Sequence, residues 1–271
     1  MDLEARGAEA VRLLRKRAGI TQAALSVRLG QPQSLVSKME TGERQLHVHD
    51  LFALAGALDI SVGRVLNTIA GLDSVLDRWD VSEAELTELV AENPSLRGMM
   101  LGYAAEMKFR RLCLAERTDI VSTKDDDHDR KRKGDCRLNY HGQEIIVEVK
   151  SLQTQTVKRV DGGDSWFGRA QVDASDRRVV TFPDGSQLGT TLLLRGEFDI
   201  LAVNCFAFGD RWRFVFALNS DLETSGWKKY TPAQRALLIK SMQDIHFPAR
   251  PPFTEDFGSV LERALASRSR S

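Results

Sequence analysis

Two helix signals separated by a glycine constrain the fold of this chain more than any other feature. Thr21 suits the N-cap of a helix, because its hydroxyl can accept a hydrogen bond from a free backbone N–H of the first turn. Leu25 and Leu29 follow on one buried face of that helix. Gly30 permits a tight turn, and Pro32 stands near the start of the next helix. The pattern predicts two short helices joined by a tight turn.

The second helix carries apolar residues on one face and polar residues on the other. Val36 and Met39 face inward by their spacing. Short and amide side chains on the outer face suit the base edges of a major groove, because glutamine can form two hydrogen bonds with adenine. The outward residues are Gln33, Ser34, Ser37 and Lys38.

This stretch closely resembles the helix-turn-helix domain of the Cro/C1 (XRE) family, over residues 10–68. The resemblance implies an all-α DNA-binding domain in residues 1–70. Pro32 stands where the family more often has a serine that caps the recognition helix. A small helical bundle that mediates protein contacts is the alternative. The matching positions are Thr21-Gln22, Leu29-Gly30 and Glu40-x-Gly42.

The same resemblance implies which side chains contact DNA. His47 and His49 lie in a nearby connector with no third ligand close to them, so we expect no metal site there. By resemblance, Gln22 and Arg44 contact phosphates, while Gln33, Ser34, Ser37 and Lys38 approach bases.

Beyond this domain the sequence predicts a connector and then a change of periodicity. Residues 71–98 indicate a helical connector, in which Ser82 and Glu85 form a capping box. A long helix follows from about Ser95 to Glu116, and strand patterns come after it. We expect a multidomain chain, an all-α bundle followed by an α/β domain of residues 99–271 with a mixed central sheet. The predicted strands are Asp119–Ser122, Cys136–Tyr140, Glu144–Lys150, Phe198–Phe208 and Arg211–Asn219, and helices begin near Thr231-Pro232 and at Phe257.

Composition excludes some classes of protein. The 271 residues carry a formal net charge of zero, which argues against a purely electrostatic, histone-like binder. No run of eighteen apolar residues predicts a membrane span, and the acidic N-terminus does not read as a signal peptide. Cys113, Cys136 and Cys205 are widely spaced and odd in number, so we expect reduced thiols in a cytoplasmic protein.

Two of the predicted strands place two carboxylates and a lysine together. Within Glu144–Lys150, Glu148 and Lys150 share one face, because side chains alternate along a strand. A hairpin centred on His141-Gly142 pairs residues whose numbers sum to 283, which sets Asp135 opposite Glu148. Two facing carboxylates repel unless a cation lies between them, and Mg²⁺ prefers oxygen ligands. A surface hairpin with a routine ion pair is the alternative.

These strands resemble the PD-(D/E)XK nuclease superfamily, which includes many restriction endonucleases, over about residues 99–220. The resemblance implies that Asp135 and Glu148 hold Mg²⁺, with Mn²⁺ as its substitute, and that the Val149 carbonyl completes the shell. Lys150 assists the attacking water. The family's proline is replaced by Gly134. Two accessory positions also match, Glu106 on the first helix and Gln171, which corresponds to a glutamine found on the second helix in some members.

Two charged segments are each open to a structural and a functional interpretation. Lys124–Lys133 contains Asp129-Arg130-Lys131, a second acid-x-Lys pattern, and we interpret it as a solvated loop in which Asp125–Asp127 are open as further metal ligands. Asp173–Arg178 is either a solvated turn or a segment whose Arg177 and Arg178 contact phosphates.

The sequence therefore predicts Mg²⁺-dependent cleavage of double-stranded DNA at a site chosen by the first domain. Restriction, defence or a mobile element would be the setting, with a methyltransferase or another regulatory partner. One such site cuts one strand, so we expect a homodimer. The alternative is a transcription regulator whose nuclease-like domain serves dimerisation or sensing. An RNA nuclease is less favoured, because A-form RNA does not offer the wide major groove that the first domain suits.

Overall fold

The computed structural model describes residues 3–72, 75–79, 81–123, 134–160 and 163–268. The chain divides into two compact units, unit 1 of residues 1–93 and unit 2 of residues 94–271. The predictions made for Lys124–Lys133, including those for Asp125–Asp127, lie outside the described residues.

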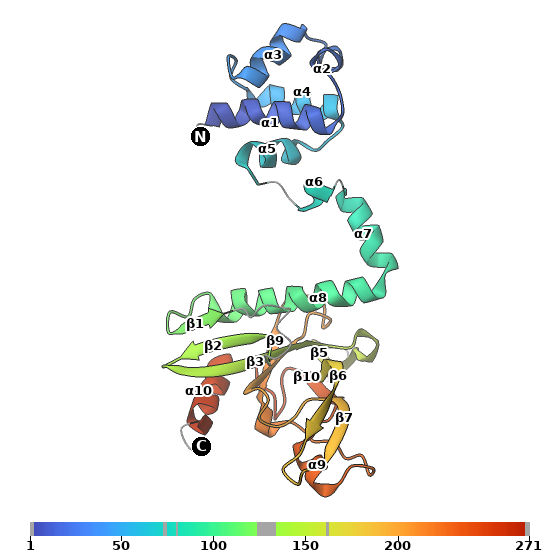
Figure 1. Cartoon of the computed structure of the whole chain (residues 1–271), viewed down its shortest axis with the longest axis vertical. Helices are drawn as coiled ribbons and strands as arrows, with labels where there is room; N and C mark the ends of the chain where they lie inside the picture. The colour runs from blue at the N-terminus through green and yellow to red at the C-terminus, as the bar shows by residue number, and fades with distance from the viewer. Residues whose placement is uncertain (1–2, 73–74, 80, 124–133, 161–162, 269–271) are drawn as a thin grey trace. The chain divides into compact units, whose positions relative to one another are not determined.

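Unit 1 is helical, as the sequence predicts (Figure 1). Its helices pack around a buried core in which Leu25, Val36 and Leu54 are completely inaccessible to solvent. The inward positions assigned from spacing, Leu25 in α2 and Val36 and Met39 in α3, are therefore confirmed. The core helices are α1 (Leu3–Arg17), α2 (Gln22–Leu29), α3 (Gln33–Thr41), α4 (Val48–Leu58) and α5 (Val62–Ala70).

The predicted connector is also helical, with α6 (Val75–Trp79) and α7 (Glu83–Glu92). Ser82 and Glu85 form the capping box expected from the sequence: each side chain accepts a hydrogen bond from the other residue's backbone N–H.

Unit 2 begins with α8 (Pro94–Phe109), which lies along strands of the central sheet (Figure 1). A π-helical turn, Arg110–Leu114, prolongs this helix. The described part of the central sheet has five strands in the order β1-β2-β3-β8-β9. It is mixed, as predicted, because β3 and β8 run parallel while the other neighbours run antiparallel. The strands are β1 (Ile120–Thr123), β2 (Cys136–Tyr140), β3 (Gln143–Ser151), β8 (Ile200–Asn204) and β9 (Phe214–Leu218).

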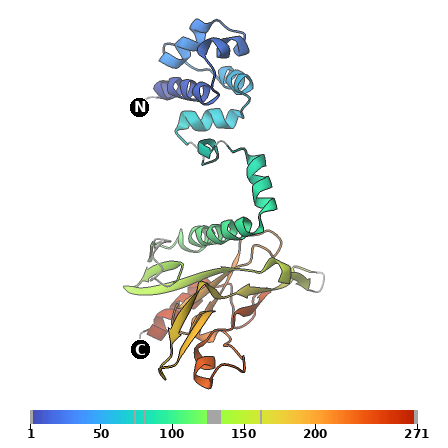
Figure 2. The same cartoon turned by 45° about the vertical axis from the view of Figure 1, so that its right-hand side comes forward.

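Two smaller sheets accompany the central one, β10-β5-β4 and β6-β7. The β6–β7 hairpin and α9 lie at the end of unit 2 that is remote from α8 (Figure 2). The strands of these sheets are β4 (Lys158–Val160), β5 (Ser165–Gln171), β6 (Asp173–Thr181), β7 (Gln187–Leu192) and β10 (Met242–Phe247). The remaining helices of unit 2 are α9 (Pro232–Leu237) and α10 (Phe257–Arg268), and short 3-10 turns lie at Thr154–Thr156 and Asn219–Asp221.

The two faces of the central sheet contribute to different hydrophobic cores. The odd-numbered β3 residues Ile145, Val147 and Val149 pack in one core with Phe109 of α8 and Leu261 of α10. The opposite face of the sheet packs in a second core that includes Leu152, Ala170, Leu201 and Val203. Because side chains alternate along a strand, Glu148 and Lys150 point to the second core and not toward α8.

The structure corrects one of the two alternatives for Asp173–Arg178 and the helical position that the resemblance implies for Gln171. Asp173–Arg178 is not a solvated turn but the first part of strand β6, which pairs with β7 through an irregular register. Gln171 lies at the end of strand β5 and not on a helix. Gln171 ends a run in which buried and exposed residues alternate, whereas Asp173–Arg178 contains no buried residue and so lacks the alternation that marks a strand.

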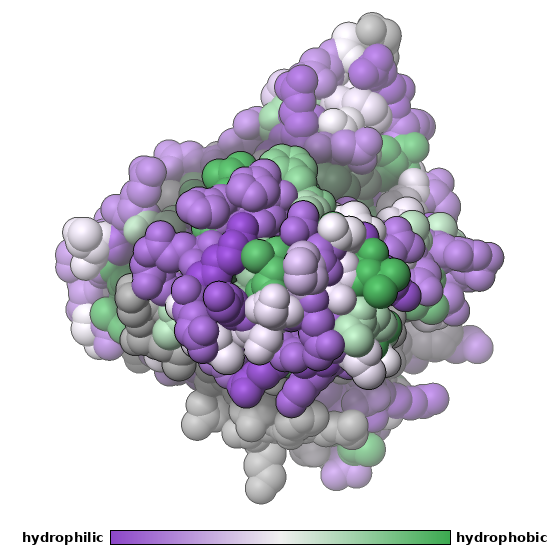
Figure 3. Space-filling view, turned by 90° about the horizontal axis from the view of Figure 1, so that it is seen from above, coloured by the Kyte–Doolittle hydropathy of each residue, from purple (hydrophilic) through white to green (hydrophobic). Residues whose placement is uncertain are grey.

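On the face seen in Figure 3 the described residues are mostly hydrophilic, with separate hydrophobic patches. Within the described residues no single helix has the length and apolarity to cross a membrane. Helices α4 and α5 meet these criteria only as a pair, and that pair is bent by 114°. Cys113, Cys136 and Cys205 are free thiols, and burial raises the pKa of Cys113 and of Cys205 to about 12.

Candidate nucleic-acid interface and candidate active site

Helix α2 has the N-cap at Thr21 and the glycine turn that the sequence predicts. The Thr21 hydroxyl accepts a hydrogen bond from the Ala24 N–H at 3.1 Å. Gly30 adopts the left-handed conformation, with φ of 64°, and ends α2. Pro32 occupies the N-cap of α3 and supplies no side-chain hydrogen bond. The recognition helix α3 therefore depends on packing and on the preceding turn for its position.

The outer face of α3 is free to meet a partner. Gln33, Ser34 and Lys38 are exposed and Ser37 is half-buried, while Val36 and Met39 on the opposite face are buried. Exposed amide, hydroxyl and ammonium groups on one face of a recognition helix suit hydrogen bonding to base edges.

The two residues expected to contact phosphates are engaged within unit 1. Gln22 donates to Glu40 Oε2 at 2.9 Å, and the same carboxylate accepts from Arg15 Nε at 2.6 Å. Arg44 donates two hydrogen bonds of 3.0 Å to Asp50. Burial opposes the charge on Asp50, but Arg44 and the His47 N–H outweigh it and lower the pKa of Asp50. These pairs fix the two side chains at the ends of the α2–α3 motif.

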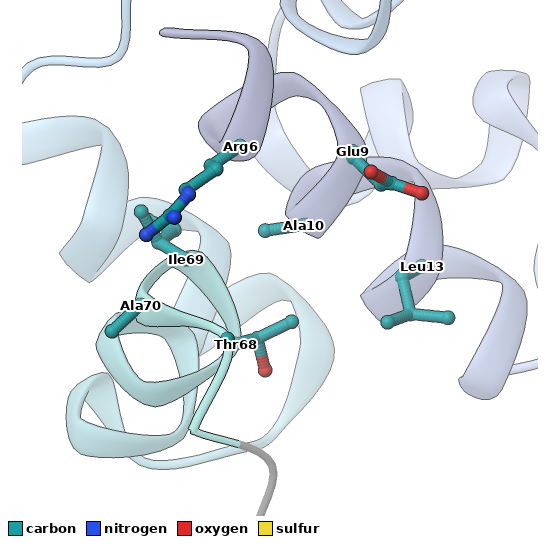
Figure 4. Close-up of a pocket in the computed structure, with 8 residues that line it drawn as sticks. Arg6, Glu9, Ala10, Leu13, Thr68, Ile69 and Ala70 are labelled. Carbon is teal, nitrogen blue, oxygen red and sulfur yellow. The ribbon is translucent and has the colours of Figure 1, made fainter. Parts of the chain in front are cut away.

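Unit 1 also has a cavity of about 400 Å³ between α1 and α5 (Figure 4). Arg6, Glu9, Leu13, Thr68 and Ile69 are among its lining residues, and none belongs to the outer face of α3. His47 and His49 stack with ring centroids 5.7 Å apart, and His47 serves as the N-cap of α4.

In unit 2 the predicted hairpin is confirmed. Strands β2 and β3 pair from Cys136 with Val147 to Tyr140 with Gln143, so every pair sums to 283. His141 and Gly142 both have positive φ, of 48° and 76°, as a tight hairpin turn requires.

Asp135 stands immediately before β2. The paired register ends at Cys136 with Val147, so the predicted pairing of Asp135 with Glu148 lies beyond it. The Asp135 N–H donates to the Val147 carbonyl at 3.0 Å, and its Oδ2 accepts from the Val149 N–H at 2.7 Å. Gly134 precedes it with φ of +80°, and a Cβ there would lie 2.3 Å from Cγ2 of Ile146. The family's proline, which fixes φ near −65°, cannot adopt this conformation. A different backbone approach therefore carries Asp135 to its place.

Glu148 and Lys150 form a close ion pair on the predicted shared face, with 2.6 Å between Lys150 Nζ and Glu148 Oε1. Burial raises the pKa of Glu148 to about 7; Lys150 opposes this rise and Asp135 adds to it. Burial alone would lower the pKa of Lys150, but Glu148 and Asp135 outweigh it, so that pKa is raised. The site therefore holds more negative charge than one ammonium group balances.

This donor set fits an oxygen-preferring divalent cation. Asp135 and Glu148 supply carboxylate oxygens, and the raised pKa of Glu148 indicates a carboxylate whose charge is incompletely compensated. Among the described residues no group of three or more histidine, cysteine, aspartate or glutamate side chains is arranged to hold a metal ion. A cation here would bind two carboxylates and fill its shell with backbone carbonyl and water oxygens, as Mg²⁺ commonly does.

The two accessory residues suggested by resemblance contact partners other than Glu148 and Lys150, and Gln171 is linked to their surroundings through Asp173. Glu106 is on α8, which packs on the opposite face of the sheet, and it forms an ion pair of 3.8 Å with Arg110 on the same helix. Gln171 is exposed, and its side chain contacts Gln153 and Asp173. The structure brings Asp135, Glu148 and Lys150 together, while Glu106 lies on α8 and Gln171 at the exposed end of β5.

Two acids near the site were not selected from the sequence. Glu197, which pairs with Arg178, raises the pKa of Glu148, and Asp173 raises that of Lys150. Asp173 follows Gln171 by two residues, and recognising this alternation as a strand would have drawn attention to it. Glu197 lies outside a regular strand, and no local signal marks it.

Comparisons with known proteins concern unit 1. Residues 11–65 match the family model HTH_3, described as helix-turn-helix. No curated protein matches the chain in sequence. The match ends before unit 2 begins, so unit 2 is described by its geometry alone.

Similar solved structures correspond to a quarter of the chain. The restriction-modification controller protein C.AhdI from Aeromonas hydrophila is 29% identical, with 23% of this chain and 90% of that chain covered and a TM-score of 0.22. An XRE-family like protein from Pseudomonas syringae pv. tomato str. DC3000 is 33% identical, covering 25% and 84%, with a TM-score of 0.22. The controller protein C.Esp1396I is 18% identical, covering 27% and 95%, with a TM-score of 0.25.

The family match agrees with the capped helices, the glycine turn and the exposed polar face of α3. Residues 11–65 of this chain therefore form a DNA-binding helix-turn-helix domain that matches the family HTH_3, the Cro/C1 or XRE type.

Proposed function

We propose that this chain is a site-directed, Mg²⁺-dependent DNA endonuclease of the PD-(D/E)XK type, acting in the cytoplasm. The observation that carries this proposal is the close pairing of Glu148 and Lys150 beside Asp135, on the middle strand β3 of the described mixed sheet. A buried carboxylate with a raised pKa, next to a second carboxylate and a lysine, is typical of a reaction centre.

The chain's residues would divide the work of phosphodiester hydrolysis. Asp135 and Glu148 would hold the cation, with the Val149 carbonyl as a further ligand. When bound, Mg²⁺, or Mn²⁺ in its place, would neutralise the charge that develops on the phosphate. Lys150 would orient the attacking water, and its positive charge would help to stabilise that negative charge. The Val149 N–H already fixes Asp135, so this carboxylate requires little rearrangement.

Unit 1 would supply the choice of DNA site. The outer face of α3 reads base edges, and unit 2 cuts nearby. Because one carboxylate pair with one lysine cuts one strand, double-strand cleavage would need a homodimer. Restriction, defence or a mobile element is the proposed setting, with a methyltransferase or another regulatory partner restraining cleavage of host DNA.

Plasmid cleavage tests this function. We expect wild type to nick or cut supercoiled plasmid in Mg²⁺, and to lose that activity in EDTA and in Lys150→Ala. Lys229→Ala, which changes a lysine over the Trp227 ring of unit 2, is the matched control and should cut normally. Equal cutting by wild type and Lys150→Ala would overturn the proposal.

The second candidate is a DNA-binding transcription regulator whose unit 2 serves dimerisation or sensing. The helix-turn-helix family match supports this candidate directly, since it requires only DNA binding of unit 1. Two of the similar solved structures are themselves described as restriction-modification controller proteins. Tight, specific DNA binding by wild type without cleavage in either Mg²⁺ or Mn²⁺ would favour the regulator.

A further inference from the structure

Asp173 is a third acid that acts electrostatically on Lys150, after Glu148 and Asp135, and one of its oxygens has no hydrogen-bond partner. Its Oδ2 accepts from Gln171 Nε2 at 2.9 Å and from Ser241 Oγ at 3.0 Å. Its Oδ1 is buried from solvent and receives no hydrogen bond. A buried carboxylate oxygen that is left unpaired is costly, so such an atom calls for an explanation.

The fold connects Asp173 to the β3 strand that carries Lys150. Just after Lys150, Leu152 bridges to Ala170 of β5. Gln153 then donates through its side chain to Gln171 at 3.0 Å, and Gln171 in turn donates to Asp173. This amide chain holds the carboxylate at a fixed place near the site. The electrostatic influence of Asp173 on Lys150, which raises the pKa of the lysine, is consistent with that proximity.

Lys150 and a divalent cation would compete for the same carboxylate. Lys150 Nζ lies 2.6 Å from Glu148 Oε1, an oxygen that a cation at this site would also use. A lysine ammonium has three donors and a flexible stem, so it can change partner without movement of the backbone. A released ammonium would need another acceptor close to Glu148.

We propose that Asp173 is a positioning residue that accepts a hydrogen bond from Lys150 through its unpaired Oδ1 when a divalent cation engages Glu148. This inference rests on the proposed function. It gives Asp173 the role of holding Lys150 beside the phosphate while Glu148 serves the cation.

Calcium binding to the full chain without DNA tests this role by isothermal titration calorimetry, because Ca²⁺ takes the same oxygen ligands. The variants are Asp173→Asn, Lys150→Ala and the double variant. In the wild-type background, Asp173→Asn should weaken Ca²⁺ binding about tenfold, the effect of losing a hydrogen bond between charged groups. In the Lys150→Ala background the same substitution should change binding less than about twofold, because the lysine that Asp173 holds is gone.

Ser241→Ala is the matched control, since it removes a hydrogen bond to Oδ2 but keeps the carboxylate. It should bind Ca²⁺ within about twofold of wild type, because the proposed hydrogen bond from Lys150 goes to Oδ1 and not to Oδ2. An equal loss from Asp173→Asn in both backgrounds would assign the carboxylate to the cation itself and overturn this inference. No effect of Asp173→Asn would overturn it too, and both results leave the proposed nuclease intact. Absence of Ca²⁺ binding by wild type would overturn the inference and the cation site together.

Discussion

At the scale of single residues, the two units use ion pairs in different ways. Arg44 and Asp50 form a two-hydrogen-bond pair that fixes the end of the helix-turn-helix motif. Glu148 and Lys150 are also paired, but they lie at a sheet face with a further carboxylate nearby. A buried charge that is incompletely compensated weakens the fold, so its presence at Glu148 is better explained by function than by stability.

The Arg44–Asp50 pair predicts a pH-dependent stability of unit 1. Asp50→Asn should lower the free energy of unfolding by about 2 kcal/mol at neutral pH, through the loss of charged hydrogen bonds. Because the folded pKa of Asp50 lies below its ordinary 3.8, this stabilisation is complete above that pH and declines as the pH falls toward the folded pKa. Urea unfolding of wild type and variant at several pH values checks this. A difference between the two proteins that persists undiminished at the lowest pH would contradict it.

The outer face of α3 predicts a separation of binding from stability. Gln33→Ala should weaken specific DNA binding by about 1–3 kcal/mol and relax the preference at one base position. Its melting temperature should stay unchanged, because Gln33 is exposed. Gln45→Ala, another exposed glutamine of unit 1, is the control. Binding to a selected DNA site, measured by fluorescence anisotropy at constant salt, would show the contrast; equal losses in both variants would exclude a reading role for Gln33.

At the scale of elements, caps and glycines place both sites. Thr21 and Gly30 define the ends of α2, and the missing side-chain cap at Pro32 leaves α3 dependent on its neighbours. In unit 2, Gly134 leads the chain into β2 with a positive φ, and the Ile146 side chain occupies the space that a Cβ at this position would need.

The cap on α2 predicts a measurable contribution to stability. Thr21→Ala should destabilise unit 1 by about 1 kcal/mol, because the Ala24 N–H loses its acceptor. Ser34→Ala, at an exposed position of α3, should change stability by less than about 0.5 kcal/mol. Equal effects of the two substitutions in thermal unfolding would argue against the capping role.

The approach to Asp135 predicts a sensitive glycine. Gly134→Ala should destabilise unit 2 by about 1–3 kcal/mol, since the new Cβ meets Ile146 and the residue keeps a positive φ. Gly185→Ala is a matched control, because Gly185 has φ of +78° but open space around its Cα. We expect Gly134→Ala also to weaken Ca²⁺ binding by displacing Asp135, and Gly185→Ala to leave it unchanged. Comparable loss of Ca²⁺ binding in both variants would contradict this account.

Much of the fold followed from local patterns at these elements. The alternation in Glu144–Lys150 and the His141-Gly142 turn were enough to set the β2–β3 register, because a hairpin with a two-residue turn has few alternatives. For Asp173–Arg178 the sequence left two alternatives open, a solvated turn and a phosphate-contacting segment, because the pairing of β6 with β7 and the hydrogen bond from Ser241 to Asp173 involve residues outside this segment. The position of Glu106 on the opposite face likewise depends on how α8 packs.

At the scale of the whole molecule, the chain joins a DNA-binding domain to a unit that carries two carboxylates and a lysine. The helix-turn-helix domain is supported by its family match and its geometry. The central claim is that DNA located by unit 1 is cut by Asp135, Glu148 and Lys150 of unit 2.

Cleavage mapping on a DNA site selected by the protein itself tests that claim most directly. A linear DNA with one selected site is incubated in Mg²⁺ with wild type, Lys150→Ala or Gln33→Ala, and binding is measured in parallel. The account predicts cuts at a fixed distance from the site by wild type, binding without cutting by Lys150→Ala, and weaker, less selective cutting by Gln33→Ala. Tight binding by wild type with no cutting, or cutting that persists in Lys150→Ala, would contradict it.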